Sequence, residues 1–391
     1  MKKFRNVLMI SALFAGMLSI SACGNGNKEE SDVTTSEKLV VKDVTVARGQ
    51  TLEIEFTLPS SYEGDDELKY SFSGYNILIE GNSVTGLKEN TETKVKATTS
   101  DGKYSTYFNV SVTESVFSVD DLILYTGFDA KPNIKFDGEG TVTFKVVDEK
   151  IATYSKEENL FQGIKVGKTK VEATVDSYST SFFITVTNMP DRISGRVETI
   201  KNTLKEQNYP QNQTIFVGDS FFDPWSWSNF YSLYEGKNVN LLGVSTAQSI
   251  DWDIFLQSFI VDLNPKNIVL HLGTNDIFDA GYNDTQTYEN MKTLIDNILE
   301  EVPNAKLYYF GIEPRYSGGT TKNNYCKNVN ELLIKNITNE RFVYLDSPAL
   351  CYNEDGTVKG EFFRDNVHPK LENYTEYVRL LKEANIEIDD K

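Results

Sequence analysis

Short apolar runs alternate with helical patterns from about residue 189 to the C-terminus, and this alternation constrains the fold more than any other feature of the sequence. Each run is continuous and rich in β-branched or aromatic residues, as expected of a strand covered on both faces. Amphipathic segments such as 287–302 and 373–384 lie between or after the runs. The pattern predicts a five-stranded parallel sheet within an α/β/α three-layer sandwich. The predicted strands are 214–218, 239–244, 267–273, 306–312 and 341–346.

Polar groups stand at the ends of these predicted strands and in the C-terminal tail. Sites of open parallel sheets form at the carboxyl ends of the strands, so we expect these groups to meet there. Gly-Asp-Ser after the first strand has two explanations. It is typical of an ordinary turn, and it is equally typical of an enzyme that exposes a serine hydroxyl at the end of a strand. The groups are Gly218-Asp219-Ser220, Gly243, the "GTND" of 273–276 and the "DNVHP" of 365–369.

The four groups resemble the SGNH, or GDSL-type, esterase and lipase family. Its blocks centre on Ser, Gly, Asn and His, which are here Ser220, Gly243, Asn275 and His368, in the same order across residues 211–386. The resemblance implies a flavodoxin-like fold and hydrolysis of ester bonds. It also implies that the oxyanion hole consists of the backbone N–H groups of Ser220 and Gly243 and the side-chain amide of Asn275.

One position departs from the family pattern. The family often has a second glycine three residues after Gly243, where this chain has Thr246. Because of this departure, the family pattern does not predict the shape of the acyl pocket, while the predicted mechanism is unaffected. Asp219 and Asp276 are expected to brace their loops rather than take part in chemistry.

The chemistry can be argued from the residues themselves. A serine hydroxyl is a poor nucleophile until a base removes its proton, and histidine is the base best suited to neutral pH. The chain has only two histidines, and His271 lies inside an apolar strand, where a structural role is expected. His368 lies in a polar loop, and a tight turn can bring Asp365 onto its Nδ1 while Nε2 faces Ser220. Alone, "DNVHP" would be a surface turn that caps the last helix; together with Ser220 and Asn275 it predicts a catalytic triad.

An aromatic cluster, "FFDPWSW", directly follows the nucleophile. Phe221, Phe222, Trp225 and Trp227 suit a sugar-stacking platform or the wall of an acyl pocket, and equally the core face of a helix. We favour the core for most of them, because Phe222 and Trp225 are spaced to share one helical face.

The region before residue 189 contains a repeat of period-two segments. A stretch ending at Val112 matches one ending at Val186, with Gly86 opposite Gly163 and Ala97 opposite Ala173. Alternating segments punctuated by turn signals predict two β-sandwiches. The "TGLKENTETKVKAT" stretch resembles the closing strands of bacterial immunoglobulin-like domains. That resemblance implies a spacer, or a module that contacts a glycan or a protein, and we favour the spacer.

The N-terminus has the features of an export signal. Basic residues precede an apolar run too short for a comfortable membrane span. The run ends in "SISAC", which resembles the lipobox of bacterial lipoproteins and implies lipidation of Cys23; an ordinary cleavage site is the alternative. We therefore expect an exported, extracytoplasmic protein, lipid-anchored to the bacterial cell membrane. The predicted parts are a signal peptide (1–22), a flexible tether (23–37), two immunoglobulin-like sandwiches (38–113 and 114–188) and the hydrolase domain (189–391).

Composition excludes several classes of function. The net charge of −18 disfavours nucleic acid as a partner. Two histidines exclude a His-rich metal site, and the mechanism needs no metal or organic cofactor. Cys326 and Cys351 can form a disulfide in an exported protein, and either can equally be a buried small side chain.

The lengths of the loops at the strand ends bear on the choice of substrate. Short loops after the strands leave little sequence for a hydrophobic lid, which favours an open site and a small acyl group. We expect removal of O-acetyl groups from a carbohydrate or cell-wall glycan. The alternatives are a lipase or lysophospholipase, a thioesterase, and a glycan- or protein-binding lipoprotein whose hydrolase domain is inactive.

Overall fold

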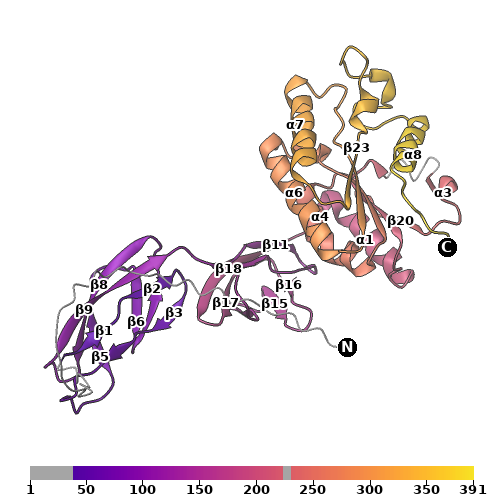
Figure 1. Ribbon diagram of the computed structural model, residues 1–391. Helices are drawn as coiled ribbons and strands as arrows, with labels where there is room; N and C mark the ends of the chain where they lie inside the picture. The colour runs from indigo at the N-terminus through magenta and orange to yellow at the C-terminus, as the bar shows by residue number, and fades with distance from the viewer. Residues whose placement is uncertain (1–37, 223–229) are drawn as a thin grey trace, which may run out of the picture.

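The computed structural model describes residues 38–222 and 230–391. Two β-rich units come first along the chain and an α/β unit follows, with the second β unit lying between the other two (Figure 1). The signal peptide, the tether, Cys23, Trp225 and Trp227 lie outside the described residues.

The first β unit contains three sheets. In the four-stranded sheet the order is β2-β9-β8-β5, with β2 parallel to β9 and the other neighbours antiparallel. A three-stranded sheet has the order β3-β7-β6, and β1 pairs with β4. The strands are β1 (Val40–Val41), β2 (Val44–Ala47), β3 (Thr51–Glu53), β4 (Phe56–Thr57), β5 (Leu68–Ser71), β6 (Ile77–Glu80), β7 (Ser83–Gly86), β8 (Thr91–Thr99) and β9 (Ser105–Thr113).

The second β unit repeats this arrangement strand for strand. Its sheets have the orders β11-β18-β17-β14, β12-β16-β15 and β10-β13, and β11 is parallel to β18. The strands are β10 (Phe117–Val119), β11 (Leu122–Tyr125), β12 (Asp129–Ala130), β13 (Ile134–Phe136), β14 (Thr143–Val146), β15 (Ala152–Ser155), β16 (Leu160–Gly163), β17 (Gly167–Val175) and β18 (Tyr178–Thr187).

The matched glycines explain part of the repeat. A Cβ at Gly86 would lie 2.7 Å from the carbonyl oxygen of Ala47, and a Cβ at Gly163 would lie 2.8 Å from that of Tyr125. Both glycines therefore permit the same close approach of two backbones. The predicted repeat is confirmed, while an immunoglobulin-like identity stays a prediction.

The α/β unit is built on a parallel sheet of order β20-β19-β21-β22-β23. Its strands are β19 (Thr214–Gly218), β20 (Val239–Leu241), β21 (Asn267–His271), β22 (Lys306–Phe310) and β23 (Phe342–Leu345). All five predicted strands are present. The first has the predicted bounds and the other four are shorter than predicted, the second most of all, although Leu242 and Val244 remain buried beside β19.

Helices cover both faces of this sheet (Figure 1). Because side chains alternate along a strand, Ile215 and Val217 enter one core while Phe216 enters the other. One face is covered by α1 (Asp191–Glu206), α4 (Ser249–Phe259), α6 (Asp284–Glu301) and α7 (Thr320–Asn336), and the other by α3 (Phe230–Leu233) and α8 (Tyr374–Glu383). The short α5 (Thr274–Phe278) follows β21.

Cys326 and Cys351 are free thiols in the two cores of this unit. Burial raises the pKa of both thiols, so they are unreactive small side chains. Within 38–222 and 230–391, no helix has the length and apolar character needed to cross a bilayer.

Candidate active site

The nucleophile candidate, Ser220, lies in the loop that leaves β19 at the carboxyl end of the sheet. Gly218 lets this loop pass close to the neighbouring strand, since a Cβ there would lie 2.0 Å from the carbonyl oxygen of His271. The backbone N–H of Asp219 donates to that same oxygen at 3.2 Å. The glycine of the Gly-Asp-Ser sequence is thus required by packing, and the serine is carried to the edge of the sheet.

Three predicted residues form a continuous chain of contacts. Ser220 Oγ lies 2.8 Å from His368 Nε2, and His368 Nδ1 lies 3.0 Å from Asp365 Oδ2. If Nδ1 carries the proton and donates to the carboxylate, Nε2 is left as the acceptor for the serine hydroxyl. The arrangement is that of a nucleophile, a base and a carboxylate that orients the base.

Asp365 is held in its ionised form. Partial burial raises its pKa, but backbone N–H groups of His368 (2.7 Å) and Val367 (2.8 Å), together with the His368 ring, lower it to about 2. The tight turn predicted from the three-residue spacing therefore both orients His368 and fixes the charge beside it.

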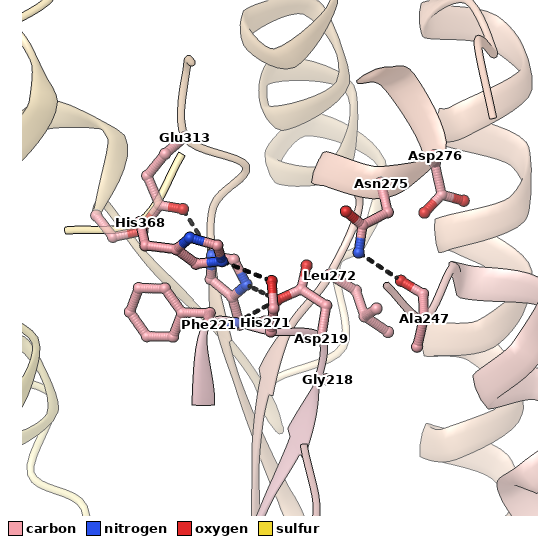
Figure 2. A network of polar contacts seen from close by, with 12 residues as sticks. Gly218, Asp219, Phe221, Ala247, His271, Leu272, Asn275, Asp276, Glu313 and His368 are labelled. Carbon is pink, nitrogen blue, oxygen red and sulfur yellow. Dashed lines mark hydrogen bonds and ion pairs between the residues drawn. The ribbon is translucent and has the colours of Figure 1, made fainter. Parts of the chain in front are cut away.

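Asn275 lines the same pocket as Ser220 and His368. Its Nδ2 donates to the carbonyl oxygen of Ala247 at 3.0 Å, which uses one of the two amide N–H groups (Figure 2). Arg315 Nη2 lies 3.4 Å from the Asn275 Oδ1. These contacts fix the amide plane at the edge of the pocket.

Gly243 does not line the pocket but packs beneath the nucleophile loop. A Cβ at this position would lie 2.7 Å from the Cβ of Phe222 and 3.0 Å from the carbonyl oxygen of Asp219. Phe221 and Phe222 are both buried in the core, as predicted for most of the aromatic cluster. Thr246, which replaces the second family glycine, has a φ of +64° and does not line the pocket.

A second histidine lies directly beneath the nucleophile loop. The His271 Nδ1 is 2.9 Å from Asp219 Oδ1 and its Nε2 is 2.6 Å from Glu313 Oε2, all three side chains being buried (Figure 2). Burial lowers the pKa of His271, but the two carboxylates raise it to about 10. His271 is therefore an imidazolium that links the loop after β19 to the loop after β22, consistent with the structural role predicted for it.

The two aspartates that were expected to brace loops make such contacts. Asp219 Oδ1 accepts from the backbone N–H of Phe221 at 3.0 Å. Asp276 is fully buried and accepts from the hydroxyl and the backbone N–H of Ser249. Burial raises the pKa of Asp276 to about 6, against the opposing effect of the Ser249 hydrogen bonds.

Sequence reasoning missed two ionisable residues of the pocket, Glu313 and Arg315. Arg315 lies over the Phe278 ring at 4.5 Å and pairs with both carboxylate oxygens of Asp279, at 2.8 and 3.1 Å. The pocket encloses about 310 Å³, including solvent at its mouth, and the side chains around it are mostly polar or ionisable. A signal did exist, because "GIEPR" puts an acid and a base at the end of an apolar strand. In the part of the chain that the structure describes, no cluster of three or more His, Cys, Asp or Glu side chains is suited to hold a metal ion.

Comparison with known proteins identifies the C-terminal region. Residues 216–375 match the GDSL-like Lipase/Acylhydrolase family, so the C-terminal part of the chain contains a GDSL-like (SGNH) hydrolase domain. A search of curated proteins found no match.

Three solved structures illustrate the similarity. A GDSL-like lipase from Bacteroides thetaiotaomicron is 18% identical, with 49% of this chain and 95% of that chain covered and a TM-score of 0.41. A carbohydrate esterase family 3 protein from Talaromyces cellulolyticus is 16% identical, with 44% and 99% covered and a TM-score of 0.35. A catalytic mutant of an acetylxylan esterase from Geobacillus stearothermophilus is 13% identical, with 46% and 96% covered and a TM-score of 0.37. Each covers less than half of this chain.

Proposed function

We propose that the chain is a serine esterase that removes small acyl groups, above all O-acetyl groups, from a carbohydrate or cell-wall glycan. The observation that carries the proposal is the chain of contacts from Ser220 through His368 to Asp365. A buried serine with no base nearby would favour a structural role, whereas here the base and its orienting carboxylate are both in hydrogen-bond range.

The geometry supports an acyl-enzyme mechanism. Ser220 Oγ attacks the ester carbonyl carbon while its proton passes to Nε2 of His368, and Asp365 stabilises the resulting imidazolium. His368 then returns the proton to the leaving alcohol oxygen as the bond between carbonyl carbon and alcohol breaks. In the second half, water attacks the acyl-serine, its proton passing through His368, and the acid leaves as Ser220 regains its hydrogen.

The negative charge of each tetrahedral intermediate requires donors. The resemblance to the SGNH family assigns this role to the side-chain amide of Asn275 and the backbone N–H groups of Ser220 and Gly243. Asn275 and Ser220 line the pocket, whereas Gly243 packs beneath the nucleophile loop. The contact of Asn275 with Ala247 supports the assignment, because it holds the amide in place before the reaction begins.

The character of the pocket supports a small acyl group. Its lining includes the ionisable side chains of Asp219, His271, Glu313 and Arg315. An alkyl chain gains little from such a lining, because few apolar side chains are there for it to pack against. A short acyl group on a hydroxylated alcohol depends less on such packing, and this is why acetylated glycans are preferred to lipids.

The proposal extends to the location of the protein. Cys23 would be lipidated after export, anchoring the chain outside the bacterial cytoplasm. The two β units would have immunoglobulin-like folds, and contact with a glycan or a protein through them is a further expectation. Neither the anchor nor such contacts bear on the chemistry of the pocket.

Acetate release tests the proposal. The full chain and Ser220→Ala are compared on acetylated xylan, acetylated peptidoglycan and p-nitrophenyl esters of increasing chain length. We expect release of acetate that is lost in Ser220→Ala and a rate that falls as the acyl chain lengthens. Faster turnover of long acyl chains would indicate a lipase, and turnover of acyl thioesters alone would indicate a thioesterase. No activity on any ester would indicate a binding protein with an inactive hydrolase domain.

A further inference from the structure

The second β unit contributes two side chains to the core of the α/β unit. Phe128 is fully buried, and its ring centroid lies 5.1 Å from that of Phe255 and 6.0 Å from that of Phe259, both on α4. Lys201 of α1 places its Nζ 3.9 Å from the centre of the Phe128 ring. Tyr125 lies beside Phe128 and is 6% exposed. The two units therefore share one core instead of meeting only through the linking residues.

Tyr125 also makes a polar contact that reaches inside the α/β unit. Its hydroxyl donates to Oδ1 of Asp251 at 2.5 Å. Asp251 is fully buried, and its Oδ2 accepts from Nη2 of Arg192 at 2.7 Å and from the backbone N–H of Gln248 at 2.8 Å. Loss of a donor to a buried carboxylate lowers the stability of the fold, because a buried charge without a partner is strongly unfavourable. One of the three donors to this carboxylate comes from a different unit of the chain.

Asp251 fixes the start of α4, and the residues at this start hold Asn275, the candidate oxyanion donor. The Gln248–Asp251 contact is half of a capping box that begins the helix at Ser249. Ala247, just before this cap, accepts the hydrogen bond from Asn275, and Ser249 donates to Asp276. Residues 247–249 therefore hold two consecutive residues of α5, including Asn275.

The same turn of α4 reaches the nucleophile strand. Trp252, next to Asp251, is fully buried, and its Nε1 donates to the carbonyl oxygen of Gly218 at 2.9 Å. A displacement of this turn would therefore change both the position of Asn275 and the end of β19 that leads to Ser220. Misplacement of a reacting group by about 1 Å can cost roughly 10²-fold in rate.

We propose that Tyr125 is a positioning residue for the esterase reaction, acting through Asp251 and the first turn of α4 to hold the oxyanion donor Asn275. The second β unit is then part of the working hydrolase, a role beyond that of a spacer. This proposal rests on the proposed function, because Asn275 matters to rate only if an ester is hydrolysed.

The test uses the full chain and p-nitrophenyl acetate. Tyr125→Phe removes one hydroxyl and keeps the ring, and Tyr154→Phe, which removes a hydroxyl that donates to Asn159 in the same β unit, is the matched control. We expect kcat to fall about tenfold in Tyr125→Phe with KM changed less than about twofold, and no change in Tyr154→Phe. Equal kcat values for the two variants would overturn the proposal.

A double-mutant cycle separates positioning from a general loss of stability. If Tyr125 acts through Asn275, then Tyr125→Phe should lower kcat by less than about twofold in an Asn275→Ala background. The same tenfold loss in both backgrounds would mean that Tyr125 does not act through Asn275. Arg192→Met, which removes another donor to Asp251, is the second probe should Tyr125→Phe fold poorly, and it should show the same dependence on Asn275.

The outcomes distinguish this proposal from the proposed function. If the wild-type chain and Ser220→Ala hydrolyse the ester equally, the proposed function fails and the role of Tyr125 fails with it. If Ser220→Ala is inactive and Tyr125→Phe matches the wild type, the esterase assignment stands and only the role of Tyr125 is lost.

Discussion

Ser220 Oγ and His368 Nε2 lie 2.8 Å apart although 148 residues separate them in the chain. The serine is carried by the loop after β19 and the histidine by the segment just before α8. The contact therefore depends on the docking of the C-terminal segment onto the sheet. Tyr374 contributes to that docking, since its hydroxyl donates to the carbonyl oxygen of Phe221 at 2.6 Å.

This relationship predicts non-additive losses of activity. Ser220→Ala and His368→Ala should each lower kcat by at least about 10³-fold, and the double variant should be no slower than the slower single variant, because the two groups act as a unit. Steady-state rates on p-nitrophenyl acetate measure this. Ser105→Ala, an exposed serine on β9, is the control and should leave kcat unchanged. Losses that multiply in the double variant would contradict the assignment.

His271 predicts a dependence of stability on alkaline pH. Its two carboxylate partners raise its pKa from the usual 6.5 to about 10, so its stabilising effect is fully present below about pH 6.5 and is lost as the pH rises through about 10. His271→Asn should reduce the free energy of unfolding at pH 6 by about 3 kcal/mol, since it leaves Asp219 and Glu313 without their buried partner. Urea unfolding at pH 6 and pH 9.5 checks both statements. The idea fails if the wild type and the variant lose stability in parallel over that range.

Substitution of Gly243 should lower activity without unfolding the chain. In Gly243→Ala the added Cβ would press on Phe222 and on the carbonyl of Asp219, and the nucleophile loop must shift. We expect kcat to fall about 10²-fold and the free energy of unfolding by about 1–3 kcal/mol. Gly195→Ala is the control, because no atom lies within 4 Å of a Cβ at that site on α1. It should stabilise the chain by about 0.5–1 kcal/mol and leave kcat unchanged; similar rates for the two variants would exclude a crowded loop.

Lipidation of Cys23 would determine whether the protein enters the detergent phase or the aqueous phase of an extraction. If its thiol is lipidated, the wild-type chain expressed in a bacterium should enter the detergent phase of a Triton X-114 extraction, while Cys23→Ala should remain in the aqueous phase. Release of acetate by the extracted variant should be unchanged, because the anchor has no part in the chemistry. Wild-type protein in the aqueous phase would contradict the lipoprotein assignment and support an ordinary cleavage site.

Local patterns predicted the elements of the fold well. Ile193, Val197, Ile200 and Leu204 recur at helical spacing in the sequence, and they are the four buried residues of α1. The strands of the parallel sheet are continuous apolar runs because helices cover both of their faces, and such runs stand out from the sequence. The repeat was visible because the same backbone contact at Gly86 and Gly163 requires glycine in both copies.

Contacts between distant segments were beyond sequence reasoning. Nothing near Glu313 in the chain indicates that its carboxylate meets His271, which is 42 residues away. Tyr125 has the ordinary alternation of a strand residue, and its partner Asp251 lies 126 residues further on. The Tyr125–Asp251 pair depends on how the second β unit docks onto the α/β unit, and one sequence does not record which surfaces meet. Glu313 and Arg315 are different, because they follow the end of a predicted strand and "GIEPR" was a signal that could have placed them at the site.

Each β unit docks onto the next unit of the chain through equivalent positions. The backbone N–H of Gly49 donates to the carbonyl oxygen of Gly86, and that of Gly127 donates to the carbonyl oxygen of Gly163. Gln50 and Phe128, which directly follow these glycines, therefore occupy equivalent positions in the two units. Residues 49–51 of the first unit exchange backbone hydrogen bonds with 177–179 of the second, and Phe128 of the second packs on α4. One edge is thus used twice, with backbone pairing at the first junction and aromatic packing at the second.

This reuse of one edge has a mechanical consequence. A catalytic unit joined to its neighbour only by a few linking residues would swivel and sample many directions, whereas a junction with a shared core resists bending. The packing of Phe128 and Tyr125 against α4 therefore restricts rotation of the α/β unit relative to the second β unit. If the substrate is a polymeric glycan, as proposed, the junctions would limit the angle at which it reaches Ser220.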